Sequence, residues 1–131
     1  MRWKIAKACK IYNFSASHFL PNVQDGHKCK RLHGHNYTVE VEIRGEINPT
    51  SGWVQDFGEI DDNMKPIIKK LDHYHLNDID GLGNPTAEVL AGWIMEQYPI
   101  MNLYRVRVWE TDRCWAEVVN TEGKWPVEMR M

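Results

Sequence analysis

Two histidines one residue apart form the pattern in this sequence that most clearly suggests chemistry. In His33-Gly34-His35, an extended backbone would direct both imidazoles to one side, where they could bind a single metal ion. His18 supplies a possible third ligand, and three histidines without a fourth protein ligand are the open form of a zinc site. Imidazole nitrogen also suits iron, nickel or copper, and two histidines that merely enter a strand remain an equally good interpretation.

A cysteine on a basic segment lies close to this pair. Cys29 precedes His33 by four residues and could act as a ligand, a nucleophile or a base. A lone cysteine is more often a small hydrophobic residue, which is how we interpret Cys9 and Cys114. The basic neighbours of Cys29 are candidate triphosphate contacts, although a solvated basic loop explains them equally well: Lys28, Lys30 and Arg31.

Two further candidates for proton chemistry lie later in the chain. Asp72 precedes His73, and a carboxylate beside an imidazole can orient it for proton transfer, although a solvated helix end also explains the pair. Glu110 continues the alternation of Val106 and Val108, and a carboxylate on an apolar face must be paired or functional. Alternation alone favours a Glu110 that lies past the end of the strand, in solvent.

Hydrophobic periodicity predicts the elements that must position these groups. Strict alternation predicts a half-buried antiparallel strand over residues 37–44, and weaker patterns predict strands over 5–17, 104–110 and 114–119. Apolar residues three and four apart predict an amphipathic helix over residues 57–71.

A proline and a second helix complete the predicted fold. Pro66 lies within the first helical pattern and should kink or interrupt it. The second helix should begin near Asn84-Pro85-Thr86 and end before Pro99, with Thr86 and Glu88 suited to its first turn. The order strand, strand, helix, helix, strand, strand predicts an α+β domain with both helices on one face of an antiparallel sheet.

Length and composition limit the class of protein. At 131 residues the chain is expected to form one domain, 1–131, and three cysteines argue against a secreted disulfide scaffold. The balance of 16 basic and 18 acidic residues argues against a nucleic-acid partner. We find no export signal and no apolar run near the roughly 20 residues of a membrane span, so we expect a cytoplasmic protein without a membrane partner.

The candidate residues fall into motifs that, taken in order, resemble one known family. The motifs are Phe14-x-Ala16-x-His18, Cys29-x-x-x-His33-Gly34-His35, Asp56-Phe57, Leu71-Asp72-His73-x-x-Leu76-Asn77, Asn84-Pro85-Thr86-x-Glu88 and Glu110-Thr111. This set resembles the 6-pyruvoyl-tetrahydropterin synthase / 6-carboxytetrahydropterin synthase family. The three-residue gap between Cys29 and His33 is similar to that of the bacterial 6-carboxytetrahydropterin synthases of queuosine biosynthesis. The tail over residues 120–131 lies outside the matched motifs.

The resemblance implies a fold, an assembly and a reaction. The fold would be the tunnelling fold, in which a four-stranded antiparallel sheet with two helices on one face joins neighbouring subunits into a barrel. The assembly would be a homohexamer, a dimer of trimers, with active sites at subunit interfaces and one zinc ion per subunit. The reaction would convert 7,8-dihydroneopterin triphosphate to 6-carboxy-5,6,7,8-tetrahydropterin with loss of acetaldehyde and triphosphate. A 6-pyruvoyl-tetrahydropterin synthase with the same substrate, and a non-catalytic zinc- or pterin-binding protein, are the alternatives.

The resemblance also implies roles for individual residues. The zinc ligands would be His18, His33 and His35. The catalytic set would be Cys29 as general base, with His73, Asp72 and Glu110 as a relay. The substrate contacts would be Glu110, Thr86, Glu88, Lys28 and Arg31, of which Glu110 would receive the amino-pyrimidine edge of the pterin through two parallel hydrogen bonds.

Overall fold

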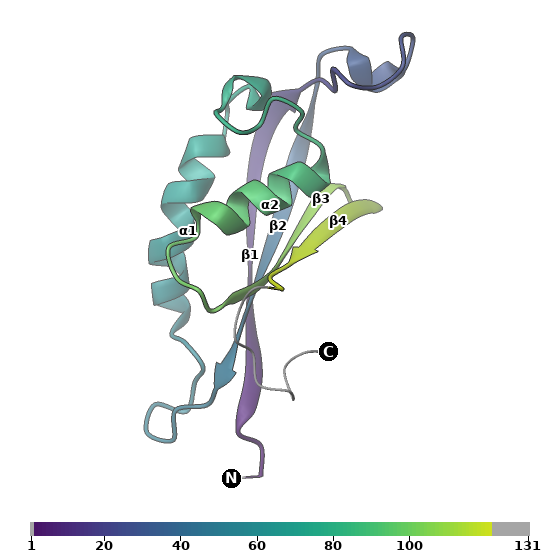
Figure 1. Ribbon diagram of the computed structural model, residues 1–131. Coiled ribbons are helices and arrows are strands. Elements are labelled where there is room, and N and C mark those ends of the chain that lie inside the picture. The colour runs from purple at the N-terminus through teal and green to yellow at the C-terminus, as the bar shows by residue number, and fades with distance from the viewer. Residues whose placement is uncertain (1, 122–131) are drawn as a thin grey trace.

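A four-stranded antiparallel sheet carries two helices on one face in the computed structural model, which describes residues 2–121 (Figure 1). The strands are β1 (Ile5–His18), β2 (His33–Glu46), β3 (Leu103–Thr111) and β4 (Cys114–Val119), paired in the order β1-β2-β3-β4. The helices are α1 (Phe57–Leu71) and α2 (Ala87–Gln97), with the short 3-10 helices η1 (Lys28–Lys30) and η2 (Leu76–Asp78). The predicted α+β arrangement is therefore confirmed. Residues 122–131 of the C-terminal tail lie outside the described residues.

The paired ends of β1 and β2 extend further than the alternation predicts. β2 begins at His33 rather than at residue 37, and β1 continues to His18, which is the direct register partner of His33. Gly34 allows this close pairing, because a Cβ at that position would lie 3.3 Å from the carbonyl oxygen of Ala16. The loop that joins the two strands carries η1 and projects beyond this end of the sheet (Figure 1).

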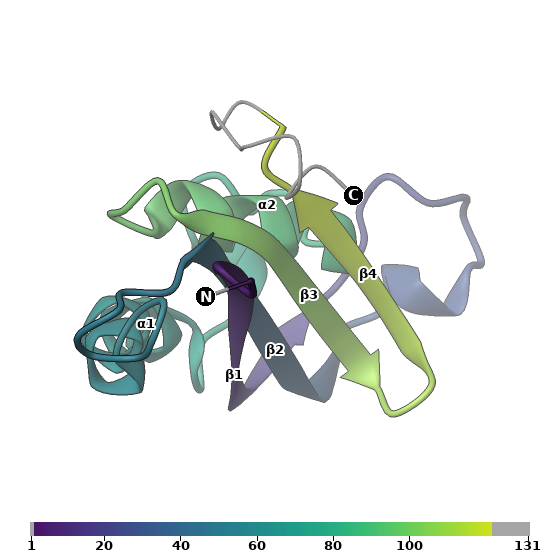
Figure 2. The same cartoon turned by 90° about the horizontal axis from the view of Figure 1, so that it is seen from below.

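The two helices cover different parts of the same sheet face. α2 packs over β3 and β4, while α1 lies along β1 (Figure 2). α1 is helical throughout Phe57–Leu71, so the expected interruption at Pro66 is wrong. Pro66 is solvent-exposed, whereas Met64 and Ile67 on the opposite stripe are buried in the core, and this packing outweighs the cost of the proline. Within residues 2–121, no helix is both long and apolar enough to cross a membrane.

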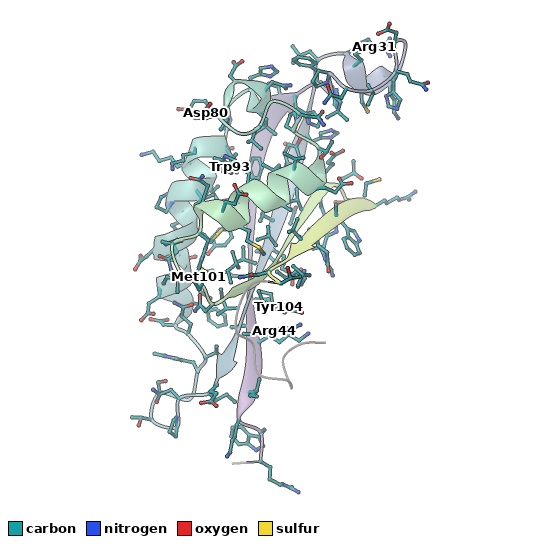
Figure 3. The ribbon with its side chains drawn as sticks, in the orientation of Figure 1. Arg31, Arg44, Asp80, Trp93, Met101 and Tyr104 are labelled. Atoms are coloured by element: carbon teal, nitrogen blue, oxygen red, sulfur yellow. The ribbon has the colours of Figure 1, made fainter. Side chains whose placement is uncertain are left out.

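The two faces of the sheet differ in chemistry. Toward the helices the strands contribute fully buried apolar side chains such as Val39, Val41, Ile43, Val106 and Val108. On the other face, buried Glu42 accepts hydrogen bonds from Nε of Arg44 at 2.6 Å and from Nε of Arg105 at 3.1 Å. Figure 3 shows Arg44 beside Tyr104, with its guanidinium 3.5 Å from the ring centroid, far from Arg31 at the opposite end of the sheet. The face away from the helices therefore carries a charged network.

Candidate metal centre and its cavity

Three histidine side chains converge where β1 ends and β2 begins. Nε2 of His18 lies 2.9 Å from Nε2 of His33, and one ring nitrogen from each of His18, His33 and His35 lies within 4.8 Å of the others. Two imidazole nitrogens bound to one tetrahedral zinc ion are about 3.3 Å apart. The three histidines singled out in the sequence therefore lie close enough to share one metal ion.

Main-chain carbonyls set the orientation of two of these rings. Nδ1 of His18 lies 2.9 Å from the carbonyl oxygen of Pro85, and Nδ1 of His33 lies 2.7 Å from that of Arg31. A carbonyl oxygen only accepts, so each Nδ1 carries the hydrogen and each Nε2 offers its lone pair to the centre of the cluster. Such outer hydrogen bonds fix the ring orientation of metal-binding histidines in general.

The imidazole of His35, the third ring of the cluster, has an unpaired nitrogen. Nε2 of His35 is buried and has no hydrogen-bond partner among the described residues, and its nearest charged neighbour is Oε2 of Glu110 at 3.6 Å. Burial lowers the pKa of both His18 and His35, which keeps their imidazoles in the neutral form that binds metals. A bound metal ion would satisfy the unpaired nitrogen, so the residues present fit such a group.

A cavity of about 460 Å³ adjoins the histidine cluster. Its lining residues are Lys28, Cys29, Arg31, Leu32, His33, His35, Glu110, Thr111 and Cys114. Half-buried Cys29 is held in η1 because its N–H donates to Nδ1 of His27 at 3.0 Å and its carbonyl accepts from Leu20 N–H at 2.7 Å. One cavity therefore combines two thiols, a carboxylate and two basic side chains beside the candidate metal ligands.

Glu110, which lines this cavity, lies at a β-bulge. Trp109 pairs with Trp115 and Thr111 with Cys114, so Glu110 is an extra residue on β3. A bulge of this kind re-aims a side chain and is common beside functional sites. Glu110 lies within β3 with its side chain 26% exposed, so the interpretation that placed it past the strand's end in solvent is wrong.

The predicted Asp72–His73 pair forms, but neither residue lines the cavity beside Cys29. Oδ1 of Asp72 lies 3.0 Å from Nδ1 of His73 and accepts a hydrogen bond from Ser15 N–H at 2.9 Å. Both contacts lower the pKa of Asp72, and the hydrogen bond from Ser15 has the larger effect. His73 has a φ of 65°, and its N–H donates to the Ser15 carbonyl. Its side chain is 82% exposed and lines a second hollow, between β1, β2 and the segment after α1, which shares His35 with the cavity beside Cys29 but does not include Cys29.

The remaining predicted substrate contacts divide into two groups. Thr86 caps α2 by accepting a hydrogen bond from Val89 N–H at 3.1 Å, and Glu88 is exposed in the first turn of that helix; neither lines the cavity. Lys28 and Arg31 do line it, whereas Nζ of Lys30 is paired with a carboxylate oxygen of Asp25.

Sequence reasoning missed several groups around the site. The carbonyl of Pro85 and the hydroxyl of Tyr37, 3.3 Å from Nδ1 of His18, both contact a candidate ligand. Nδ1 of His75 lies 3.0 Å from Oγ of Ser17, a contact that no sequence pattern indicates. The polar hydroxyl of Tyr37 on an otherwise apolar strand face was the one available signal, because the other contacts join residues remote in the sequence.

Comparison with known proteins places this chain in a family. A family model described as 6-pyruvoyl tetrahydropterin synthase matches residues 7–121. The chain belongs to this family. Among relatives in this family, a 6-carboxy-5,6,7,8-tetrahydropterin synthase of Synechocystis is 38% identical over 110 residues, covering 78% of this chain and 84% of the relative. A 6-pyruvoyl tetrahydrobiopterin synthase of Drosophila melanogaster is 32% identical over 133 residues, covering 87% of this chain and 77% of the relative.

A solved structure supports the fold of the family. The 6-pyruvoyl tetrahydropterin synthase of Caenorhabditis elegans superimposes with a TM-score of 0.82 at 28% identity, over 89% of this chain and 96% of that one. The antiparallel sheet and its two helices are therefore those of the tunnelling fold that the motifs implied.

Proposed function

We propose that this protein is a zinc-dependent 6-carboxytetrahydropterin synthase. It would convert 7,8-dihydroneopterin triphosphate to 6-carboxy-5,6,7,8-tetrahydropterin, with loss of acetaldehyde and triphosphate, as a step of queuosine biosynthesis. The observation that carries the proposal is the unpaired Nε2 of His35, which faces a cavity that also holds Cys29 and Glu110. The Synechocystis relative, which bears this enzyme's name, supports the choice of product.

The substrate would be held by charge and by paired hydrogen bonds. The carboxylate of Glu110 can accept two parallel N–H bonds from the amino-pyrimidine edge of a pterin, since it is not hydrogen-bonded to His35 at 3.6 Å. Lys28 and Arg31 line the other part of the cavity and would pair with the triphosphate. Both are exposed, so their charges are free to meet an anionic ligand.

Proton abstraction would be the task of Cys29. When bound to the three histidines, zinc would supply Lewis acidity toward the hydroxylated side chain of the substrate and make an adjacent C–H more acidic. The thiolate of Cys29 would take that proton, and the main-chain contacts of Cys29 with His27 and Leu20 fix its position on η1. Cytoplasmic conditions would keep this thiol reduced.

Assembly into a hexamer would complete the site. Within residues 2–121, the outer edge of β1 over residues 5–14 and the outer edge of β4 have no strand partner, and such open edges pair with other chains. Joined edge to edge, subunits would close a barrel with the helices outside and the Glu42 network facing the interior. His73 is exposed and does not line the cavity that holds Cys29 of its own chain, so we assign it, with Asp72, to the relay of a neighbouring subunit's site.

The decisive experiment is turnover of 7,8-dihydroneopterin triphosphate by the zinc-loaded protein. Release of acetaldehyde with a 6-carboxy product supports the proposal. A pyruvoyl product without acetaldehyde would identify a 6-pyruvoyl-tetrahydropterin synthase, the activity named for the Drosophila relative. Zinc and pterin binding without turnover would identify a non-catalytic binding protein.

The cavity provides a matched control for the base. Cys29 and Cys114 both line it, and both are free thiols. Cys29→Ala should lower turnover by about 10²–10⁴-fold, the usual contribution of a general base, and should leave the zinc content intact. Cys114→Ala should retain activity; equal losses in the two variants would reject Cys29 as the base.

A further inference from the structure

A tyrosine hydroxyl is buried beside the candidate metal ligands. Tyr37 follows His35 by two residues on the same face of β2 and is 1% exposed. Its hydroxyl oxygen lies 3.3 Å from Nδ1 of His18, which is its single hydrogen-bond partner among the described residues. Its ring lies edge-on to the ring of His18, with centroids 6.0 Å apart, and to that of His35, at 5.4 Å.

Packing alone does not account for this hydroxyl. The ring of Tyr37 stacks on Phe14 at 4.9 Å and 12°, a contact that a phenylalanine would make equally well. A buried hydroxyl costs free energy unless it is hydrogen-bonded, and His18 supplies that bond. The hydroxyl of Tyr37 is therefore explained by its contact with His18 and not by packing in the core.

The direction of the hydrogen bond follows from the neighbouring carbonyl. Pro85 O lies 2.9 Å from Nδ1 of His18 and can only accept, so Nδ1 carries the hydrogen. The hydroxyl of Tyr37 must then accept a share of the same hydrogen. Two acceptors on different elements thus restrain one ring.

We propose that Tyr37 is a positioning residue of the metal centre, whose hydroxyl and ring hold His18 and His35 in the orientation that binds zinc. This inference rests on the zinc site of the proposed function and not on the identity of the pterin product. Hydrogen bonds around metal-binding histidines typically change metal affinity 10- to 100-fold when they are removed. Because Pro85 remains as a second acceptor, we expect the lower end of that range for Tyr37.

The test compares two isosteric substitutions that each remove one buried hydroxyl. Tyr37→Phe deletes the bond to His18. Tyr98→Phe is the matched control, because Tyr98 is 7% exposed and its hydroxyl accepts from Asn63 Nδ2 at the same 3.3 Å, at the end of α2. Zinc affinity is measured by competition with a chelator on metal-free, folded protein, and the visible spectrum of the cobalt-loaded protein reports ligand geometry.

We expect zinc affinity to fall about tenfold in Tyr37→Phe, with an altered cobalt spectrum, and to stay within twofold of the wild type in Tyr98→Phe. Wild-type affinity and an unchanged spectrum in Tyr37→Phe would overturn the role of Tyr37 while leaving the zinc site intact. Equal losses in the two variants would overturn it too, because they would reflect general destabilisation. A wild-type protein that binds no zinc would remove the metal centre and this role with it, whereas zinc binding without pterin turnover would reject only the proposed reaction.

Discussion

His35 on β2 and Glu110 on β3 face one another in the same cavity, with Nε2 and Oε2 3.6 Å apart. This distance exceeds that of a hydrogen bond, so His35 and Glu110 are not hydrogen-bonded to each other. A nitrogen of His35 is therefore available to a metal ion, and both carboxylate oxygens of Glu110 are available to an organic ligand, as the proposed function requires.

Substitutions at these two positions should therefore have separable effects. Glu110→Gln should leave bound zinc unchanged but raise KM for the pterin about 30-fold, because the amide loses the charge and one of two acceptor oxygens, worth about 2 kcal/mol. His35→Ala should lose the zinc. Metal analysis together with steady-state kinetics separates the two outcomes, and loss of zinc in Glu110→Gln would contradict the assignment.

Mixed oligomers test whether the site is shared between subunits. Cys29→Ala and His73→Ala should each be inactive alone. Refolded together in equal amounts, they should regain about a quarter of wild-type activity, because about a quarter of interfaces then pair an intact Cys29 with a neighbour's intact His73. No recovery in a mixture of confirmed hexamers would mean that both residues act within one chain.

The buried carboxylate of Glu42 should make stability sensitive to acid. Burial favours the neutral form, but hydrogen bonds from Arg44 and Arg105, with their charges, lower the pKa of Glu42 below its ordinary value of 4.5. The stabilisation it provides is therefore complete above that ordinary value and is lost as the pH falls through the lower folded-state pKa.

Glu42→Gln removes this titration. It should reduce the free energy of unfolding at pH 7 by about 2 kcal/mol, since it removes the buried charge that accepts hydrogen bonds from Arg44 and Arg105, while Arg105 keeps its contact with Glu40. Denaturant unfolding between pH 7 and pH 3 should show a smaller decline with acid in the variant than in the wild type. Parallel curves would exclude Glu42 as the source of the acid sensitivity.

Thr86 should act through the helix rather than through the substrate. Because its Oγ1 caps α2, Thr86→Ala should cost about 1 kcal/mol in unfolding free energy, while Thr86→Ser, which keeps the cap, should cost much less. Thermal unfolding and KM for the pterin are measured on both variants. A raised KM with unchanged stability in Thr86→Ala would instead indicate direct contact with the pterin.

The periodic elements could be predicted because their signals are local. The alternation that begins at Tyr37 and the three-and-four spacing in α1 recur within a few residues, and each dictates which face is buried. The same parity placed His33 and His35 on the side of β2 that faces the core. The interruption expected at Pro66 was wrong because a local pattern shows the cost of a proline but not the stabilisation from the buried residues on the core-facing side of α1.

The contacts that complete the site could not be predicted, because they join residues far apart in the chain. Pro85 meets His18 across 67 positions, and Ser15 meets Asp72 across 57. Such pairings depend on how the segment before α2 and the end of α1 lie against β1, which no local pattern encodes. The bulge at Glu110 likewise depends on the register between β3 and β4.

The sequence by itself determined the chemical groups, their faces on the strands and the family they resemble. Those properties follow from residue type and from the two backbone periods. Only the tertiary structure decided that His18 joins His33 and His35 in one cluster, and that His33 and His35 line a cavity with Cys29 and Glu110 while His73 does not. Distances between groups are set by strand register and packing, and these emerge when the whole sheet is assembled.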